Sequence, residues 1–376
     1  MPAFSADDHR FMARAVELAR RGLFSTHPNP RVGCVIVKQG RIVGEGYHIR
    51  AGGPHAEIHA LHAAGDQARG ATAYVSLEPC SHHGKTPPCA DALIAAEISR
   101  VVVAMRDPNP LVAGQGMQRL EAAGIATESG LLQAEAEAIN PGFIKRMTEG
   151  LPWVRVKLAM SLDGRTAMAS GESQWITGEA ARKDVQWLRA RSEAVLTGIG
   201  TVLADDPSLN VRLDAAELGV EGEVIQPLRV VVDSNLVMPA SARMLVLDGE
   251  TLVFTQSNDV RKIEKLETAG AEVRVIEGKN GQTDLSEVLK ELARREVNEV
   301  HVEAGARLCG ALLAEGLVDE IVLYMAGHIM GDAGKGLFHL PGIREMAGRR
   351  KVRIADIRAV GEDWRITAIP EPLEKP

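Results

Sequence analysis

The chain has 376 residues, 45% of them hydrophobic and 25% charged, with a formal net charge of −7. This length exceeds one ordinary domain and predicts two or three, each with its own packed core. The acidic balance and an aromatic content of only 3% argue against a general nucleic-acid or membrane surface, because such surfaces use clustered positive charge or aromatic stacking. A local basic pocket for one phosphate group stays compatible with this composition.

The cysteines and the N-terminal residues predict a cytoplasmic α/β protein. Four cysteines are too few for a disulfide framework in a chain this long, so free thiols and metal ligation are favoured. Cys34 lies in an apolar strand and is expected to be a core thiol. No apolar run reaches transmembrane length, and the first residues lack the basic and apolar segments of a signal peptide.

Helices and strands alternate in the first half, which predicts an αβα sandwich. A helix is expected from Ser5, whose hydroxyl can cap it, to about Arg21. The other expected elements are strands at 34–38, 41–47, 73–77 and 101–105 and helices at 55–64 and 89–96.

One histidine, one glutamate and two cysteines between positions 55 and 89 give the strongest chemical signal. His55, Cys80 and Cys89 are three ligands that zinc accepts, and they leave a fourth position open for water. Zinc lowers the pKa of bound water from 15.7 to roughly 7, and Glu57 could then carry the water proton. H-x-E followed by P-C-x-x-C is the signature of zinc nucleobase deaminases. Here eight residues, instead of two, separate the cysteines.

Two alternative metal sites use other histidines. His59 lies four residues after His55, so it shares a helix face and could also bind metal. His55 is favoured because it precedes Glu57 by two residues and starts the helix. A closed structural zinc site would take its fourth ligand from His82 or His83, and Glu57 would then have no role.

The second half begins after the helix breaker Asn140-Pro141-Gly142, and the predicted domains are residues 1–148 and 149–376. Repeated strand–helix units predict a mostly parallel sheet with ligands at the carboxyl ends of its strands. Strands are expected near 153–159, 194–198, 229–233, 252–254, 273–276, 300–303 and 321–324, helices near 177–191, 258–269, 284–295 and 306–316, and an antiparallel edge pair at 352–357 and 364–368.

Three loops have two interpretations each. The strand–glycine–helix junction at Glu303–Leu308 could let a phosphate reach a helix N-terminus, or it could be a tight turn. The glycine-rich segment Thr197–Thr201 has the same two interpretations. The polar loop Arg106–Pro110 could contact a ligand after its strand or be an ordinary Asp/Pro/Asn turn.

Several segments together resemble the family of bifunctional riboflavin-biosynthesis deaminase–reductases, in which the insert between the cysteines is lengthened, as here. The resemblance covers essentially the whole chain. It implies a cytidine-deaminase-like αβα sandwich with one zinc ion, followed by a dihydrofolate-reductase-like α/β domain with a mostly parallel sheet that uses NADPH. The segments that carry it are Pro28–Gly33, His55–Glu57, Glu78–Cys89, Asp107–Pro110, Lys157–Ala167, Ser173–Thr177, Thr201–Pro207 and Glu303–Gly305.

By this resemblance the substrate is a small phosphorylated pyrimidine ribotide. The first domain would deaminate 2,5-diamino-6-(5-phosphoribosylamino)pyrimidin-4(3H)-one, and the second would reduce the ribosyl side chain of 5-amino-6-(5-phosphoribosylamino)uracil. We expect neither a nucleic-acid nor a membrane partner, and we expect a homo-oligomer. One alternative is a zinc deaminase of another pyrimidine or of tRNA with a non-catalytic C-terminal module. Another is a zinc-stabilised scaffold without activity.

The resemblance also implies the roles of individual residues. Glu57 and, in the reductase step, Asp205 are the expected acid/base groups. Arg189 and Arg212 suit a phosphate monoester because a guanidinium group can donate two parallel hydrogen bonds. Pyrimidine contacts fall on Asn29, His48, Lys85, Asp107 and Asn109, cofactor contacts on Ala159, Trp175, Thr201, Asp205, Ser234, Gly305, Ala306, Arg307, Leu308, Cys309, Gly310 and Ala311, and ribotide contacts on Ser173, Arg189, Leu209, Arg212 and Glu303.

Overall fold

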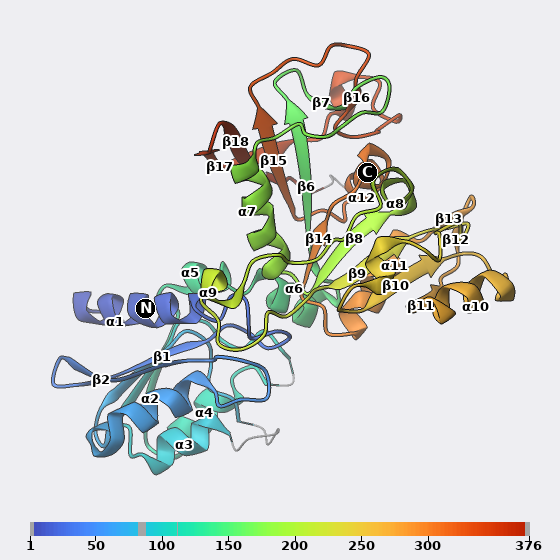
Figure 1. Ribbon diagram of the computed structural model, residues 1–376. Coiled ribbons are helices and arrows are strands. Elements are labelled where there is room, and N and C mark those ends of the chain that lie inside the picture. Colours follow the sequence, from blue (N-terminus) through green and yellow to red (C-terminus); the bar gives the residue numbers. More distant parts are fainter. Residues whose placement is uncertain (1–3, 82–87, 111, 373–376) are drawn as a thin grey trace. The chain divides into compact units, whose positions relative to one another are not determined.

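The computed structural model describes residues 4–81, 88–110 and 112–372. The chain divides into two compact units, and each has its own central sheet (Figure 1). The first unit comprises Met1–Gly150 with Gly219–Glu221, and the second comprises Leu151–Leu218 with Gly222–Pro376. Within the described residues, no helix combines the length and apolarity that crossing a bilayer requires.

The first unit is built on a five-stranded sheet with the order β2-β1-β3-β4-β5. Strand β1 is antiparallel to both of its neighbours, whereas β3, β4 and β5 run parallel. The residues that follow β3 and β4 therefore emerge at the same edge of the sheet. The strands are β1 (Gly33–Lys38), β2 (Arg41–Tyr47), β3 (Thr72–Val75), β4 (Arg100–Val103) and β5 (Ala126–Ser129).

Helices cover both faces of this sheet, which confirms the expected αβα sandwich (Figure 1). Helices α2 (Ala56–Ala64), α3 (Cys89–Ala95) and α4 (Gln115–Ala122) pack on one face, and α1 (Ala6–Arg20) and α5 (Gln133–Glu137) pack on the other. Gly46 lets α2 approach β2 closely, because a Cβ atom there would lie 2.4 Å from the Ala56 carbonyl oxygen. The short helix η1 (Gly65–Ala68) follows α2, and α6 (Pro141–Glu149) ends the unit.

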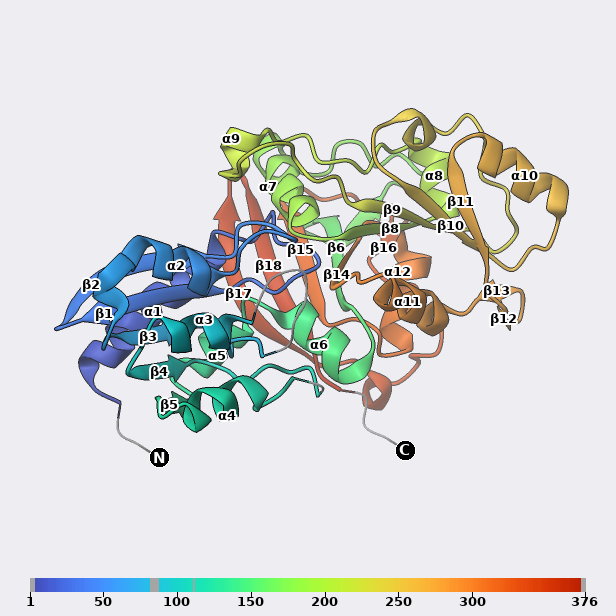
Figure 2. The ribbon, with the colours of Figure 1, turned by 90° about the horizontal axis from the view of Figure 1, so that it is seen from below.

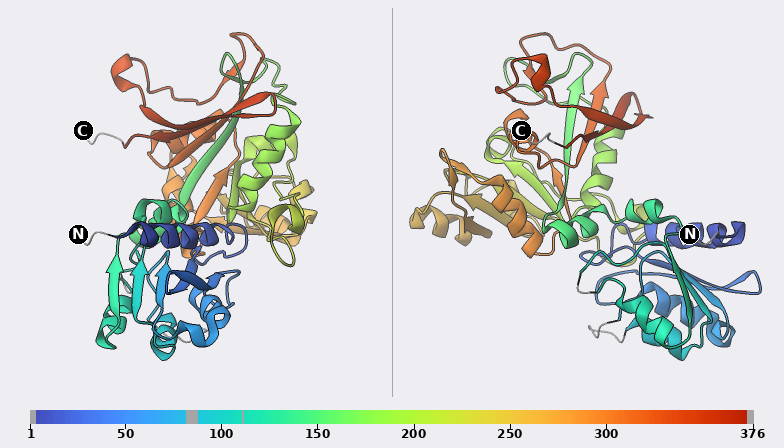
Figure 3. Two further views of the ribbon diagram at one scale, coloured as in Figure 1. Left: turned by 90° about the vertical axis from the view of Figure 1, so that its left-hand side faces the viewer. Right: turned by 180° about the vertical axis from the view of Figure 1, so that it is seen from behind.

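The second unit is built on a nine-stranded sheet with the order β11-β10-β9-β8-β14-β6-β15-β18-β17 (Figure 2). The first seven strands of this order are parallel, as expected. Strands β17 and β18 form the expected antiparallel pair at one edge (Figure 3). The strands are β6 (Trp153–Ser161), β8 (Ala194–Gly198), β9 (Leu228–Val232), β10 (Thr251–Thr255), β11 (Ala271–Val275), β14 (Glu299–Val302), β15 (Glu320–Ala326), β17 (Val352–Val360) and β18 (Asp363–Pro370).

Helix α7 begins later than the sequence predicts. The sequence predicts Thr177 as the N-cap, whereas Gly178 is the N-cap and its N–H donates to the Asp363 carboxylate at 2.8 Å. This acceptor comes from β18, far along the chain, so no local pattern could reveal it. The helices of this unit are α7 (Glu179–Ala190), α8 (Ile199–Asp205), α9 (Ala215–Leu218), α10 (Val260–Thr268), α11 (Leu285–Arg294), α12 (Ala306–Ala314), η2 (Arg243–Val246) and η3 (Met346–Gly348), with two small strand pairs, β7 (Arg165–Ala167) with β16 (Lys335–Gly336) and β12 (Gly278–Lys279) with β13 (Gln282–Thr283).

A buried ion network joins the amino ends of three central strands. Arg155 on β6 lies 3.1 Å from Glu299 on β14 and 2.8 Å from Glu320 on β15. Arg191 also reaches Glu299, at 3.0 Å. Because Arg155 and Glu299 are each 1% exposed, both charges depend on each other for solvation. This network leaves the carboxyl ends of the same strands available for ligands.

Candidate active sites

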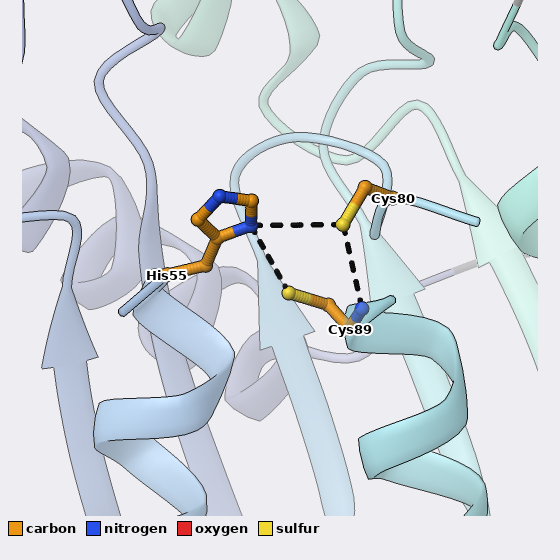
Figure 4. A group of neighbouring side chains, drawn as sticks. All are labelled: His55, Cys80 and Cys89. Atoms are coloured by element: carbon orange, nitrogen blue, oxygen red, sulfur yellow. Dashed lines mark hydrogen bonds between the residues drawn. The ribbon is translucent and has the colours of Figure 1, made fainter. Parts of the chain in front are cut away.

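His55, Cys80 and Cys89 come together in the first unit, with their ligand atoms within 4.8 Å of one another (Figure 4). His55 is the N-cap of α2, Cys80 follows β3, and Cys89 is the first residue of α3. The His55 Nδ1 atom lies 3.2 Å from the Cys89 Sγ atom and 3.6 Å from the Cys80 Sγ atom. One imidazole and two thiols at these distances fit zinc with one coordination position left open.

Two hydrogen bonds join Cys80 to Cys89 and Ala90, the residues at the two ends of the segment between the cysteines. The Cys89 N–H donates to the Cys80 sulfur at 3.3 Å, and the Ala90 N–H donates to the Cys80 carbonyl oxygen at 3.1 Å. Hydrogen bonds from the Cys89 thiol, His55 and the Cys89 N–H lower the pKa of Cys80, although burial opposes this. The thiolate is the form that binds metal. Lys85, His82 and His83 lie outside the described residues.

Glu57 lies in the first turn of α2 and is 3% exposed. Burial raises its pKa to about 7, and the charge of Cys80 adds to this shift. A carboxyl group with a pKa near neutrality can both accept a proton and return it, which is what a hydrolytic deamination requires.

The structure places the competing residues away from the ligand set. His59 is not part of the metal group, and its buried Nε2 atom has no hydrogen-bond partner among the described residues. Cys34 is completely buried in β1, and burial raises the pKa of its thiol, which confirms a core role.

Asn29 and His48 lie beside the metal group. The His48 ring makes an edge contact with the His55 ring, with centroids 5.3 Å apart. Its Nε2 atom lies 3.0 Å from the Asn29 Nδ2 atom, and its Nδ1 atom lies 3.0 Å from the Pro54 carbonyl oxygen. These contacts fix the backbone directly before His55.

Asp107 and Asn109 follow β4, at the same sheet edge as Cys80 after β3. The Asp107 Oδ1 atom accepts a hydrogen bond from the Asn109 N–H at 2.8 Å, so this loop contains an Asx turn. The loop is thus a defined turn, and it leaves the sheet at the same edge as the segment that carries Cys80.

The second candidate site lies at the carboxyl ends of the parallel strands of the second unit. Arg189 on α7 donates from Nε and Nη2 to the two carboxylate oxygens of Glu303, at 2.5 Å and 3.0 Å. Its Nη1 atom donates to the Asn210 carbonyl oxygen at 2.9 Å. The guanidinium fork that was expected to face a phosphate is therefore engaged by Glu303, which follows β14.

Two ionisable groups near Glu303, His301 and Lys157, have no role assigned from the sequence. The His301 Nε2 atom lies 3.3 Å from the Glu303 Oε1 atom. Burial lowers the pKa of Lys157 on β6, whereas Glu303 opposes that shift. Burial alone would raise the pKa of Glu303, but Arg189 and His301 hold it well below its usual range. A lysine inside a buried strand is unusual, and this was the signal available in the sequence.

Three of the expected cofactor residues follow neighbouring strands of this edge: Thr201 after β8, Ser234 after β9 and Gly305 after β14. Gly305 is the N-cap of α12 without a side-chain cap, and a Cβ atom there would meet nothing within 4 Å. The first N–H groups of α12 are therefore open to a phosphate, which fits NADPH. Ser234 is held by Thr283, whose N–H and hydroxyl both lie 3.0 Å from the Ser234 Oγ atom.

The predicted cofactor residues of α12 differ in exposure between the first turn of the helix and the residues after it. Cys309 is completely buried, and its thiol donates to the Ala304 carbonyl oxygen at 3.3 Å. Gly310 packs on the backbone of His339, since a Cβ atom there would lie 2.3 Å from that carbonyl oxygen. Gly305 and Arg307 in the first turn of α12 are exposed, whereas Leu308 packs beside Gly198.

The remaining predicted residues lie at separate places in the second unit. Ser173 and Trp175 line a cavity of about 290 Å³ with Met168, Glu172, Gln174, Ile176, His328 and Met330. Trp175 is 70% exposed, and the Arg182 guanidinium lies 4.7 Å from its ring centroid. Asp205 is exposed at the end of α8. Ala159 lies on β6, the Leu209 side chain is buried, and Arg212 is exposed.

Comparisons with known proteins cover both units. A model of the RibD C-terminal domain matches residues 152–366, and a model of the cytidine and deoxycytidylate deaminase zinc-binding region matches residues 5–105. The riboflavin biosynthesis protein RibD of Escherichia coli (strain K12) is 53% identical over 362 residues, which covers 95% of this chain and 97% of the relative. The chain belongs to the RibD family.

Solved structures of the RibD family have the same fold. Acinetobacter baumannii RibD (form 1) matches with a TM-score of 0.89 and 46% identity, covering 97% of this chain and 99% of that one. The Thermotoga maritima diaminohydroxyphosphoribosylaminopyrimidine deaminase/5-amino-6-(5-phosphoribosylamino)uracil reductase matches with a TM-score of 0.83 and 34% identity over 97% of this chain and 99% of that one.

Family membership confirms the function expected from the sequence. The chain is a bifunctional enzyme of riboflavin biosynthesis, with a zinc-dependent deaminase and an NADPH-dependent reductase. Its substrates are small phosphorylated pyrimidines. A non-catalytic C-terminal module and an inactive zinc scaffold therefore have no support.

Proposed function

We propose that residues 1–148 deaminate 2,5-diamino-6-(5-phosphoribosylamino)pyrimidin-4(3H)-one and that residues 149–376 reduce the ribosyl side chain of 5-amino-6-(5-phosphoribosylamino)uracil. The observation that carries the first assignment is the buried Glu57 carboxyl group beside three converging metal donors. The name of the Thermotoga maritima relative supports both substrates. The product of the deamination is then the substrate of the reduction.

In the deamination, His55, Cys80 and Cys89 hold zinc, which when bound activates a water molecule as the nucleophile. Glu57 would accept one proton of that water and pass it to the ring nitrogen, and it would then carry the second proton, from the added hydroxyl, to the amino group that leaves as ammonia. Asn29, His48, Lys85, Asp107 and Asn109 contact the pyrimidine ribotide. For Asp107 and Asn109 the support is their place at the carboxyl end of β4, next to Cys80.

In the reduction, the protein positions both reactants, and NADPH would supply the hydride for C1 of the ribose. The open N-terminus of α12 and residues Ala159, Trp175, Thr201 and Ser234 hold the cofactor. Ser173, Leu209, Arg212 and Glu303 hold the ribotide, with Arg189 as the partner that keeps Glu303 ionised and in place. Asp205 is our candidate acid/base group.

The proposed order of reactions is tested with the purified full-length chain. With the diamino ribotide and no NADPH, we expect ammonia release without further change. NADPH oxidation should begin only after ammonia has been released. NADPH oxidation that precedes ammonia release would contradict the proposed order.

Removal of zinc should separate the two activities. Chelation is expected to abolish ammonia release while leaving NADPH oxidation with the uracil ribotide unchanged, because the metal donors all belong to the first unit. Zinc content, ammonia release and NADPH absorbance measured on one chelated sample test this expectation. Ammonia release that continues without zinc would contradict the metal assignment.

Arg212→Ala is expected to weaken binding of the phosphorylated substrate in the reductase step. The exposed guanidinium of Arg212 is available for a phosphate, whereas that of Arg189 is engaged by Glu303. One charge-assisted hydrogen bond corresponds to about a tenfold change in binding, so KM should rise by about that factor. A dephosphorylated substrate should show no such difference between the variant and the parent chain.

A homo-oligomer and a cytoplasmic location complete the proposal. Strand β17 is an edge strand on which Ile354 is 56% and Ile357 is 53% exposed, and Trp364 on β18 is 48% exposed. Exposed apolar residues on an unpaired edge are suited to a second copy of the chain. The four cysteines are all free thiols, which suits a reducing compartment. Sedimentation of Ile357→Lys tests the interface, and a smaller assembly is expected.

A further inference from the structure

Glu78 is a buried carboxylate with an unusual set of hydrogen bonds. It follows β3, is 3% exposed, and accepts hydrogen bonds from four backbone N–H groups. The Oε2 atom accepts from Asp107 at 3.1 Å and from Gly114 at 2.9 Å. The Oε1 atom accepts from Gly116 at 3.0 Å and from Met117 at 3.3 Å.

These hydrogen bonds replace the missing cap of helix α4. The N-cap residue Gly114 makes no side-chain cap, so the first N–H groups of α4 need acceptors from elsewhere. Glu78 supplies them with a negative charge, which the positive end of a helix dipole favours. Gly116 also packs directly on the backbone of Pro79, since a Cβ atom there would lie 2.0 Å from the Pro79 carbonyl oxygen.

The same carboxylate therefore connects two parts of the deaminase site. Along the chain it lies two residues before the metal donor Cys80. Through the Asp107 N–H it holds the start of the loop that carries Asp107 and Asn109. The Glu78 N–H itself donates to the Met105 carbonyl oxygen at 3.0 Å, so backbone and side chain of Glu78 both bind the segment that follows β4.

We propose that Glu78 is a positioning residue of the deamination: it fixes the substrate loop after β4 relative to the metal donor Cys80. Glu78 does not touch the reacting atoms in this proposal. Its loss leaves the metal donors in place but lets the loop and the start of α4 move. The inference rests on the proposed contact of Asp107 and Asn109 with the pyrimidine ribotide.

Glu78→Gln in the full-length chain is the primary test. The amide keeps the shape of the side chain but loses the charge and turns one acceptor into a donor that faces N–H groups. We expect KM for the diamino ribotide to rise at least about tenfold, the effect of one lost charge-assisted hydrogen bond. Zinc content and NADPH oxidation with the uracil ribotide should stay at the level of the parent chain.

Glu45→Gln is the matched control. Glu45 on β2 also accepts two hydrogen bonds, from Arg14 at 2.7 Å and 2.9 Å, but these come from α1 on the opposite face of the sheet. This variant loses a carboxylate charge in the same unit, together with its ion pair to Arg14, and should leave the KM of deamination unchanged. Glu78→Asp keeps the charge on a shorter side chain, and it is the alternative test variant if Glu78→Gln does not fold.

Three outcomes overturn the proposal. The first is an unchanged KM in both Glu78 variants. The second is a loss of zinc in both variants, which would make Glu78 a structural support of the metal site. The third is a failure of both variants to fold, which would make Glu78 a structural support of the fold. Asp107→Asn separates this failure from failure of the proposed substrate site, because it keeps the Oδ1 acceptor for Asn109. If Asp107→Asn raises KM and the Glu78 variants do not, only the positioning role is wrong. If the Asp107 variant also has no effect, the loop is not the substrate site.

Discussion

Glu57→Gln is expected to abolish deamination and spare everything else. Glutamine has the shape of glutamate but cannot accept the water proton, and general acid–base catalysis contributes roughly a hundred- to ten-thousand-fold to such reactions. We therefore expect the rate of ammonia release to fall by about that range. The raised pKa of the buried carboxyl, about 7, places Glu57 where proton transfer in both directions is efficient.

The same variant provides its own controls. Glu57 is not one of the three metal donors, so zinc content should remain at one ion per chain if the ligand assignment is correct. NADPH oxidation with the uracil ribotide should also be unchanged, since the reductase unit has its own core. If the variant keeps zinc and still releases ammonia within about tenfold of the parent rate, a group other than Glu57 carries the proton.

Glu303→Gln is expected to abolish reduction and to destabilise the second unit. The Arg189 guanidinium is 10% exposed, and without the Glu303 carboxylate it would be a buried charge with no counter-ion. Removing one partner of a buried ion pair costs about 3–5 kcal/mol. Urea unfolding followed in the parent chain and the variant measures the loss, and NADPH oxidation measures the activity.

Two further variants separate stability from chemistry. The double variant with Arg189→Met and Glu303→Gln removes both charges. Its free energy of unfolding should therefore exceed the value obtained by adding the effects of Arg189→Met alone and Glu303→Gln alone. The double variant should still fail to reduce substrate. Glu272→Gln is the matched control, because Glu272 accepts two hydrogen bonds of 2.7 Å from Arg295 in a more exposed pair. Exposed pairs contribute about 0–1 kcal/mol, so little change is expected. Strictly additive single effects would contradict the coupling of Arg189 and Glu303.

The metal donors could be predicted because their chemistry is local in the chain. His55 and Glu57 share one helix turn, and Cys80 and Cys89 stand at the end of a strand and the start of a helix. Each such position is recognisable from spacing and residue type. The alternation of strands and helices likewise predicted a mostly parallel second sheet, because repeated strand–helix units leave few other arrangements.

The partners of the charged residues could not be predicted, because they depend on which strands become neighbours. Arg189 and Glu303 are 114 positions apart, and Glu78 meets backbone groups up to 39 positions away. A solvent-exposed charge and a buried, paired charge look the same in sequence. The N-cap of α7 at Gly178, one residue after the predicted Thr177, was missed for the same reason, since the carboxylate that accepts from its N–H belongs to Asp363.

Because hydrogen bonds join Cys80 to Cys89 and Ala90, the positions of the two metal donors do not depend on the length of the segment between them. Each cysteine is held by its own element, and the Cys89 and Ala90 N–H groups join those elements next to the metal. The length of the intervening chain is then free to change, because lengthening a loop whose ends are already fixed costs little free energy. The metal site of such a deaminase can therefore keep its geometry while the number of residues between its two cysteines changes.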